Sequence, residues 1–364
     1  LQLHNFYMEL AYRMASRAIG TTGSNPPVGC IIVKKNNIIS RGWTQPTGKP
    51  HAEIHAIRQV KDKALLNGAE IYCSLEPCSH FGKTDPCVDS IIKSGIKKVF
   101  IGDIDKNPIV NGKGIARLEK SKIKVKILFN KKIKELNKIF FNSKIEKRPL
   151  ILSKIASTLD SKIATSNSES KWITNSLSRS HGHYLRFKSD AMLVGKNTIL
   201  LDDPDLQCRL DGLQIFSPNI FILDSNLQTP ATQKIFKAKN RQVYIFHKKN
   251  IDKKKLKKFT NTKAILLPID WKNNFLDINK VILKMGSIGV QRILVEGGAE
   301  LITQLINKKL VDILYWFRAS KLIGNEGLNA VSNLSITKIK SVKELKLISS
   351  MQIQSDTLEV YGRK

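Results

Sequence analysis

The sequence predicts an α/β protein built from two different domains. At 364 residues, with 41% hydrophobic and 25% charged residues, the chain is long enough for two globular cores. Strand-like runs rich in β-branched residues alternate with helical runs in both halves. A basic helical stretch ends at Pro149, after which the strand pattern restarts. The boundary is therefore predicted near residues 146–149, giving domains over 1–146 and 147–364.

The elements of the first half follow from local patterns. The start, LQLHNFYMELAYRMA, predicts an amphipathic helix, and GCIIVKKNNIISRGW predicts a hairpin that turns at Asn36-Asn37. HAEIHAIRQVKDKALLNGA predicts one helix with Gly68 beyond its end. EIYCSLEPC predicts a short buried strand, PCVDSIIKSGI a helix that stops at Gly95, and KKVFIGDIDKNP another strand. This order predicts a layered α/β sandwich.

The second half begins with the strand LILSKIAST. Six more strand-like runs follow: SDAMLVG, NIFILD, QVYIFH, AILLP, RILVEGG and ILYWFRA. Helical runs such as NSLSRSHGHYLRFK and AELITQLINKKL alternate with them. No repeat relates the two halves, which is why two different domains are predicted.

The net charge of +31 is compatible with nucleic-acid binding or with a general lysine bias. Lys, Asn and Ile recur in every region, which favours the bias, and we expect no nucleic-acid partner. No apolar run approaches the roughly 20 residues that span a bilayer, and the first helix has no cleavage pattern of a signal peptide, so no membrane association is expected. Five cysteines, an odd number, do not make a disulfide framework, and we expect a reduced, cytoplasmic protein.

The segment GKPHAEIHAI contains three residues that could bind a metal or act in catalysis: His51, Glu53 and His55. A later segment, LEPCSHFGKTDPC, adds Cys78 and Cys87. One histidine, two thiolates and an open position for water make a catalytic zinc site. Glu53 can then move a proton from that water to a leaving amine. A structural zinc would instead want four protein ligands and no acid beside them.

The positions of the prolines indicate how these residues meet. A proline precedes both His51 and Cys87, so each is predicted to open a helix, where the backbone is irregular enough for His51 and Glu53 to face one metal. A helix start also favours the thiolate of Cys87. His55, one turn inside its helix, is predicted to have a structural role. The other cysteines are expected to take no part, two lying in apolar strands and one in a polar loop: Cys30, Cys73 and Cys208.

The zinc-deaminase signature H-x-E…P-C-x-x-C is met, except that eight residues separate Cys78 from Cys87. This longer gap occurs together with NPPVGC and DIDKNPIVNGKGI in the first half and with KIASTLDSKIA, SESKWITN, HYLRFKSDAMLVGKNTILLDDPDLQCR and VEGGAEL in the second. With these motifs the whole chain resembles the bifunctional riboflavin biosynthesis deaminase–reductases. The resemblance implies a cytidine-deaminase-like α/β/α sandwich followed by a dihydrofolate-reductase-like α/β domain. No G-x-G-x-x-G follows an early strand of the second half, which agrees with a domain of this kind.

The resemblance also implies two reactions on one small phosphorylated pyrimidine. Zinc-dependent hydrolysis of 2,5-diamino-6-ribosylamino-4(3H)-pyrimidinone 5′-phosphate releases ammonia, with Glu53 moving the proton. NADPH then reduces the ribosyl chain to ribityl, giving 5-amino-6-ribitylamino-uracil 5′-phosphate. His80 and Lys83, in the widened gap, are candidates for holding the phosphate, and a solvated loop is the alternative for both. We expect a homo-oligomer.

Contacts in the second half are carried over from the family pattern. Implied contacts to NADPH are Ala156, Trp172, Thr198, Asp202, Ser225, Gly298, Ala299, Glu300, Leu301, Ile302, Thr303 and Gln304. Implied contacts to the substrate are Ser170, Arg186, Leu206, Arg209 and Glu296. The residues themselves support this in part, since EGGAELI places two glycines at a strand-to-helix turn that can bind phosphate, and two arginines suit a phosphate group. Without the family pattern, Trp172 would be interpreted as a core aromatic and Arg186 as an exposed helix charge.

Two positions depart from the family pattern. Pro27 stands where the family has asparagine, which removes an amide side chain and a backbone donor. Ser161 stands where the family has glycine, and it costs on the order of 1 kcal/mol if the turn requires a positive φ. Neither change touches the zinc ligands or Glu53.

Two other functions compete with this one. A nucleic-acid base deaminase would explain the charge and the zinc motif, but the late second cysteine and the reductase-like second half oppose it. A zinc-stabilised basic binding module is opposed by Glu53 and by the open coordination position.

Overall fold

The chain forms two compact units, Leu1–Arg148 and Pro149–Lys364, in a computed structural model. The structure describes residues 2–23, 25–80, 85–107, 110–145, 148–238, 240–272 and 275–364. The strand pattern of the second unit restarts one residue after the junction, at Leu150.

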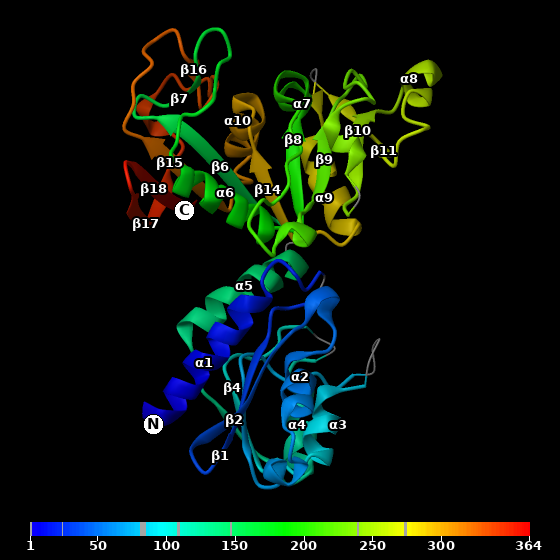
Figure 1. The fold of residues 1–364 in the computed structure, drawn as a ribbon, viewed down its shortest axis with the longest axis vertical. Coiled ribbons are helices and arrows are strands. Elements are labelled where there is room, and N and C mark those ends of the chain that lie inside the picture. The colour runs from blue at the N-terminus through cyan, green and yellow to red at the C-terminus, as the bar shows by residue number, and fades with distance from the viewer. Residues whose placement is uncertain are drawn as a thin grey trace. The chain divides into compact units, whose positions relative to one another are not determined.

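The first unit is built on a five-stranded sheet with the order β2-β1-β3-β4-β5 (Figure 1). Strand β1 (Gly29–Lys34) is antiparallel to β2 (Asn37–Trp43) and to β3 (Glu70–Cys73). Strands β3, β4 (Lys98–Ile101) and β5 (Lys124–Ile127) run parallel. Because β3 and β4 are parallel neighbours, their carboxyl ends lie side by side at one edge of the sheet. The segments that carry Cys78 and Asp103 follow these two ends.

Helices cover both faces of this sheet because successive side chains of each strand point to opposite sides. On one face Ile31, Tyr72 and Phe100 pack with residues of α1 (Gln2–Ala18) and α5 (Lys131–Ile145). On the other face a larger core contains residues of three more helices, α2 (Ala52–Gln59), α3 (Cys87–Lys93) and α4 (Lys113–Lys120). Figure 1 shows α1 and α5 on one side of the strands and α2, α3 and α4 on the other. The result is the predicted three-layer α/β/α sandwich.

Two local predictions for this unit were wrong in detail. The β1–β2 hairpin turns at Lys35-Asn36, one residue earlier than predicted, and both residues have positive φ (48° and 64°), as the twist of a two-residue hairpin turn requires. The helix that opens at residue 52 ends at Gln59 and does not continue to Gly68. Val60 is extended, and the Asp62 side chain caps a separate short 3₁₀ helix, which breaks the expected helix in two.

The second unit is built on a nine-stranded sheet with the order β11-β10-β9-β8-β14-β6-β15-β18-β17. The strands are β6 (Leu150–Thr158), β8 (Ala191–Gly195), β9 (Asn219–Leu223), β10 (Val243–Lys248), β11 (Ile265–Ile269), β14 (Arg292–Glu296), β15 (Ile313–Ala319), β17 (Leu345–Ile353) and β18 (Asp356–Arg363). The seven strands from β11 to β15 are parallel, and these are the seven that the sequence predicts. The antiparallel β17–β18 hairpin at the end of the sheet was not predicted.

Helices also cover this second sheet. Apolar residues of α9 (Ile278–Ser287) and α10 (Ala299–Asn307) form its main core together with strand residues such as Phe221 and Val295. On the other face α6 (Ser176–Phe187) packs through His181, whose ring lies 5.5 Å from that of Phe317. The shorter elements are α7 (Lys196–Asp202), α8 (Lys253–Lys257), the pair β7 (Lys162–Ala164) and β16 (Leu328–Asn329), and the pair β12 (Trp271–Lys272) and β13 (Phe275–Leu276).

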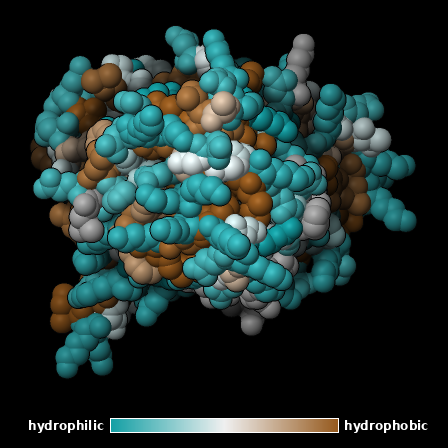
Figure 2. All heavy atoms as spheres, turned by 90° about the horizontal axis from the view of Figure 1, so that it is seen from below, coloured by the Kyte–Doolittle hydropathy of each residue, from teal (hydrophilic) through white to brown (hydrophobic). Residues whose placement is uncertain are grey.

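Hydrophilic side chains dominate the surface in the view of Figure 2, and hydrophobic ones appear between them as separate areas. This is the ordinary composition of a globular surface. Within the residues that the structure describes, no helix is both long and apolar enough to cross a membrane.

Candidate functional site

His51, Cys78 and Cys87 come together in the first unit, and their possible ligand atoms all lie within 4.8 Å of one another. The Nδ1 atom of His51 lies 3.2 Å from the Sγ atom of Cys87 and 3.5 Å from that of Cys78. One imidazole nitrogen and two thiol sulfurs are the donors that catalytic zinc takes, with a fourth position left for water. The three residues therefore fit the zinc ion that the sequence predicted.

The local structure confirms how the prolines position two of these ligands. His51 is the extended N-cap residue of α2, and Cys87 is the first residue of α3, directly after the N-cap residue Pro86. The backbone N–H of Cys87 donates to the sulfur of Cys78 over 3.4 Å, and that of Val88 donates to the Cys78 carbonyl. A hydrogen bond from the Cys87 side chain lowers the pKa of Cys78. The helix start thus supports a thiolate at Cys78. It does not favour the thiolate of Cys87 as predicted, because the hydrogen bond to Cys78 and burial raise the pKa of Cys87.

Glu53 lies in the first turn of α2, buried beside the three ligands. Burial raises the pKa of Glu53, and the negative charge of Cys78 raises it further. Its carboxyl group interacts with the side chain of Cys87. A buried carboxyl with a raised pKa takes up a proton more readily than an exposed one, which suits a proton shuttle.

His55 has the structural role that was predicted. Its Nδ1 atom contacts the amide of Gln45 at 3.0 Å and the backbone N–H of Trp43 at 3.4 Å. Its Nε2 atom contacts the amide of Gln59 at 3.1 Å. Both ring nitrogens are therefore engaged away from the ligand set.

Glu76, two residues before Cys78, was missed by the sequence analysis. Its buried carboxylate accepts backbone hydrogen bonds from Gly112 at 3.0 Å and Gly114 at 2.9 Å, and longer ones from Asp105 and Ile115. These bonds fix the loop after β4 and the start of α4 beside the zinc ligand. An acid placed directly after an apolar strand, in LEPC, was the available signal.

The two phosphate candidates of the first unit remain predictions. His80 is exposed, two residues after Cys78. Lys83 lies outside the residues that the structure describes.

In the second unit the implied NADPH contacts gather at the carboxyl ends of neighbouring parallel strands. Thr198 follows β8, Ser225 follows β9 and Gly298 follows β14, and these strands lie in the order β9-β8-β14. Ligands of open parallel sheets bind at such an edge. Ala156 lies half-buried within the neighbouring strand β6, and Asp202 is the last residue of α7.

The turn before α10 is shaped for close approach of a phosphate. Gly297 and Gly298 both have positive φ (78° and 74°), and a Cβ on Gly297 would lie 3.0 Å from the Oγ1 atom of Thr198. The helix begins at Ala299, so the backbone N–H groups of its first turn point out of the helix end. Three of the implied contacts, Leu301, Ile302 and Thr303, bury their side chains, so at these three positions only backbone groups are available to a cofactor. The turn therefore fits the phosphate groups of NADPH.

Trp172 is not a core residue. Its side chain is 61% exposed, and the guanidinium of Arg179 lies 4.4 Å from the ring centroid. The core interpretation of Trp172 is therefore wrong, and the ring is accessible to a ligand. Ser170 lies half-buried in the loop that precedes it.

Arg186 and Glu296 form a buried, two-pronged ion pair, with Nε–Oε1 and Nη2–Oε2 distances of 2.9 Å each. Burial raises the pKa of Glu296, but the charge and hydrogen bonds of Arg186 outweigh it and hold that pKa at about 2. The interpretation of Arg186 as an exposed helix charge is therefore wrong. Lys154, a partner of Glu296 in the β6–β14 register, is a further cation beside this pair that the sequence analysis missed.

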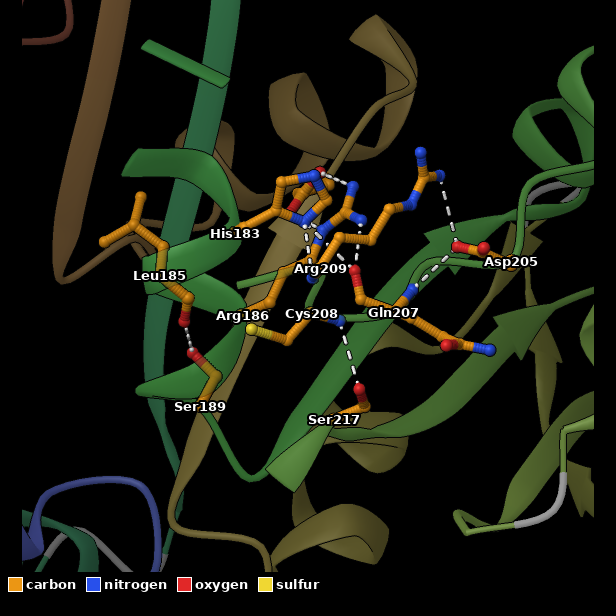
Figure 3. Close-up of polar contacts among 10 residues, drawn as sticks. His183, Leu185, Arg186, Ser189, Asp205, Gln207, Cys208, Arg209 and Ser217 are labelled. Carbon is orange, nitrogen blue, oxygen red and sulfur yellow. Dashed lines mark hydrogen bonds and ion pairs between the residues drawn. The ribbon is translucent and has the colours of Figure 1, made fainter. Parts of the chain in front are cut away.

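The loop 205–209 brings the remaining substrate candidates to this pair (Figure 3). The Gln207 carbonyl accepts from Nη1 of Arg186 at 2.9 Å and contacts Nδ1 of His183 at 3.1 Å. Leu206 is buried with φ of 53°, and Arg209 reaches Asp205 through Nη2 at 3.3 Å. The Arg186–Glu296 pair thus lies beside the loop that carries Leu206 and Arg209. No contact in the described part of the chain joins Ser170 to them.

Cys208, Ser161 and Pro27 also have defined positions in the structure. Cys208 does lie in this loop, as predicted, and its side chain is fully buried. Ser161 does have a positive φ of 62°, and its Oγ accepts a hydrogen bond from Arg318 at 3.1 Å. Pro27 is buried in the segment before β1, where Thr44 accepts the N–H of Val28 and donates to the Pro26 carbonyl.

Comparison with known families assigns both units. Residues 1–103 match the model of the cytidine and deoxycytidylate deaminase zinc-binding region, and residues 149–358 match that of the RibD C-terminal domain. The riboflavin biosynthesis protein RibD of Aquifex aeolicus is 36% identical over 335 residues, covering 92% of this chain and 91% of that protein. The RibD protein of Escherichia coli is 32% identical, covering 94% of each chain.

Solved structures give the same result. The diaminohydroxyphosphoribosylaminopyrimidine deaminase/5-amino-6-(5-phosphoribosylamino)uracil reductase of Thermotoga maritima has a TM-score of 0.86 at 30% identity, covering 100% of this chain and 99% of that one. Acinetobacter baumannii RibD, form 1, has a TM-score of 0.88 at 29% identity with the same coverage. The predicted fold class, the zinc and the NADPH dependence are thereby confirmed. The chain belongs to the RibD family, the bifunctional deaminase–reductases of riboflavin biosynthesis.

Proposed function

We propose that the first unit deaminates 2,5-diamino-6-ribosylamino-4(3H)-pyrimidinone 5′-phosphate and that the second reduces the ribosyl chain of the product. The observation that carries this proposal is the meeting of His51, Cys78 and Cys87 within 4.8 Å, with the buried carboxyl of Glu53 beside them. Family membership supports the second step. We assign deamination to residues 1–146 and reduction to residues 147–364.

For deamination, His51, Cys78 and Cys87 bind the zinc, and Glu53 transfers the protons. Bound zinc supplies a Lewis acid that lowers the pKa of water to near 7. Glu53, with its raised pKa, accepts a proton from the attacking water and passes it to the departing amine, which leaves as ammonia. Glu76 keeps the neighbouring loop and the start of α4 in place through its four backbone hydrogen bonds.

For reduction, the turn at Gly297-Gly298 and the start of α10 hold the phosphates of NADPH, and Trp172 lies open to contact it. Bound NADPH supplies the hydride. Arg209 holds the substrate phosphate, while Arg186 and Glu296 fix each other at the base of the site. His80 and Lys83 hold the phosphate of the substrate in the deaminase site.

A two-stage assay on one zinc-loaded sample tests this function. The pyrimidine phosphate should release one equivalent of ammonia, after which NADPH absorbance should fall. Absence of ammonia release with zinc fully loaded would contradict the deaminase assignment. Steep, salt-dependent RNA binding without turnover would favour the nucleic-acid alternative, which the spread of lysines does not support.

We further propose a homo-oligomer that forms through β17. This strand is an edge of the nine-stranded sheet, and seven of its nine residues are exposed. Leu347, Ile348 and Met351 expose between 50% and 58% of their surface. An exposed edge with apolar side chains is a template for pairing with another chain.

We place the protein in the cytoplasm. All five cysteines are free, and Cys30 and Cys73 face each other across β1 and β3 with their sulfurs 3.9 Å apart. The zinc site needs thiolates at Cys78 and Cys87, which a reducing compartment preserves.

A further inference from the structure

Arg117, in the last turn of α4, contacts the chain segments that carry both cysteines of the zinc site. Its Nη2 atom lies 2.6 Å from Oδ1 of Asp89, and its Nη1 atom donates to the Ser79 carbonyl over 3.2 Å. Ser79 directly follows Cys78, and Asp89 lies in the first turn of α3, two residues after Cys87. One guanidinium therefore joins the two segments.

The guanidinium suits this task because its N–H groups form a planar fork of fixed geometry. Both contacts leave from one rigid group, so the carbonyl and the carboxylate must keep a fixed separation to satisfy it. The ion pair adds little to the stability of the fold, since the side chains are 40% exposed for Arg117 and 21% for Asp89. The contacts therefore act on the position of the segments more than on the stability of the unit.

The start of α4 is fixed against the same chain segment. Gly114, three residues before Arg117 and on the same side of the helix, donates its N–H to Oε1 of Glu76 at 2.9 Å. A Cβ on Gly114 would lie 2.2 Å from the Pro77 carbonyl oxygen, so the helix and the segment are in close contact. Arg117 thus reaches both cysteine segments from a helix that has a defined place.

The long gap between the cysteines explains why this contact is needed. In the C-x-x-C form of the zinc-deaminase signature, only two residues separate the thiols. Here eight residues separate Cys78 from Cys87, and a longer loop costs more conformational entropy to close. The backbone N–H groups of Cys87 and Val88 bond to Cys78 over 3.4 Å and 3.3 Å. Arg117 adds two shorter contacts from a third segment.

We propose that Arg117 is a positioning residue of the deaminase site, which sets the separation of the two thiolate ligands of the zinc. This inference rests on the proposed function, which assigns Cys78 and Cys87 to that zinc. Because α3 begins at Cys87, a fixed Asp89 keeps that ligand in place. The bound Ser79 carbonyl does the same for Cys78, which it follows. Groups that orient metal ligands in this way typically change metal affinity or activity by about 10–100-fold when they are removed.

The zinc affinity of the full chain tests this role. Arg117→Met keeps an apolar stem without the charged fork, and competition with a chromophoric chelator should show zinc binding weakened about tenfold or more. Lys98→Met is the matched control, because it removes an ion pair of similar length and exposure in the same unit, between Lys98 and Glu70 at 2.7 Å. This control should bind zinc as wild type does. Arg117→Lys, whose ammonium group lacks the fork, should fall between wild type and Arg117→Met.

Cobalt in place of zinc reports the arrangement of the ligands. The sulfur-to-cobalt and d–d absorption bands depend on ligand geometry, and in fully loaded Arg117→Met they should shift or lose intensity. The kcat for ammonia release should fall about tenfold or more, while reduction of pre-deaminated substrate stays unchanged. Metal-free Arg117→Met should melt at the same temperature as metal-free Lys98→Met. An arginine with a merely structural role would lower that temperature and leave the cobalt spectrum of the loaded protein unchanged.

A double mutant tests whether Arg117 acts through α3. Asp89→Ala should also weaken zinc binding, and Asp89→Ala combined with Arg117→Met should lose no more affinity than Arg117→Met alone. Losses that multiply would mean that the two side chains act independently and would overturn the inference.

Two further outcomes separate this inference from the proposed function. Unchanged zinc affinity and an unchanged cobalt spectrum in Arg117→Met overturn this inference alone. A Cys78→Ser variant that binds zinc and releases ammonia as wild type does overturns the assignment of the zinc ligands, and this inference with it.

Discussion

In the proposed mechanism, Glu53 is the residue on which the deaminase chemistry depends most directly. Glu53→Gln keeps the shape of the side chain but removes its ability to carry a proton. Ammonia release should fall by roughly a hundredfold or more, while zinc content and reduction of pre-deaminated substrate stay unchanged. Ammonia assay, metal analysis and NADPH absorbance on the same sample check this. Loss of zinc in the variant would mean that Glu53 is a ligand.

Glu296 should make the second unit sensitive to acid. Its pKa, held at about 2 by Arg186, lies below its ordinary value, so its ion pair stabilises the fold above about pH 4.5 and this contribution is lost as pH falls towards 2. The contribution is on the order of 3 kcal/mol. Glu296→Gln should therefore be less stable than wild type at pH 7, and the difference should shrink towards pH 2.

Urea unfolding at several pH values, followed by tryptophan fluorescence, measures this difference. The exposed Glu344 provides the control, since Glu344→Gln should give a small offset at any pH. A Glu296→Gln difference that does not depend on pH would contradict the assigned ion pair.

At the scale of single residues, sequence reasoning predicted proximity where the geometry is local. His51 and Cys87 do lie close together with Glu53 beside them, because a short motif and preceding prolines define their geometry. Lys154 could not be assigned, because its place beside Glu296 arises from pairing between distant strands. A lysine inside the apolar strand LILSKIAST was the available signal.

Among the elements, the start of α4 determines how the zinc ligand Cys78 is supported. A Cβ on Gly114 would lie 2.2 Å from the Pro77 carbonyl oxygen, so backbone must move to admit it. Gly114→Ala should destabilise the first unit by about 1–3 kcal/mol and weaken zinc binding. Gly182→Ala, whose Cβ would meet nothing nearer than 3.8 Å, is the matched helical control. Thermal unfolding with metal analysis distinguishes the two, and equal stability of both variants would contradict this role of α4.

Elements with a clear hydrophobic pattern in the sequence were predicted well, and elements defined by tertiary packing were not. The seven parallel strands are apolar runs that the sequence displays plainly. The helix α2 was predicted too long because helical spacing continues past Gln59, although Asp62 starts a new turn there. The hairpin β17–β18 was not predicted because seven residues of β17 are exposed, so no alternation of buried and exposed residues marks the strand.

At the scale of the whole molecule, the two activities should separate on metal removal. A chelator should abolish ammonia release, because only the first unit holds zinc ligands in the proposed assignment. Reduction of pre-deaminated substrate by NADPH should continue at an unchanged rate. Zinc re-addition should restore the first activity, and parallel loss of both activities would contradict the assignment.

Assembly through β17 can be tested by placing a charged side chain on this strand. Met351→Lys places an ammonium group on the exposed edge and should shift the protein towards monomers in sedimentation velocity, since charged side chains protect sheet edges. Lys340→Met, a change of similar size in an exposed 3₁₀ turn, should leave the assembly as in wild type. An unchanged sedimentation coefficient in Met351→Lys would exclude this edge as the interface.

The two edges of the nine-stranded sheet are not alike. The outer strand β11 carries Pro268, whose nitrogen has no hydrogen to donate, whereas β17 contains no proline. Strand addition is therefore open at one end of the sheet and hindered at the other. Two copies that pair through β17 use the open end of each, and no further copy can join in the same way. A strand that is open to pairing can thus remain on the surface of the enzyme without starting a fibril.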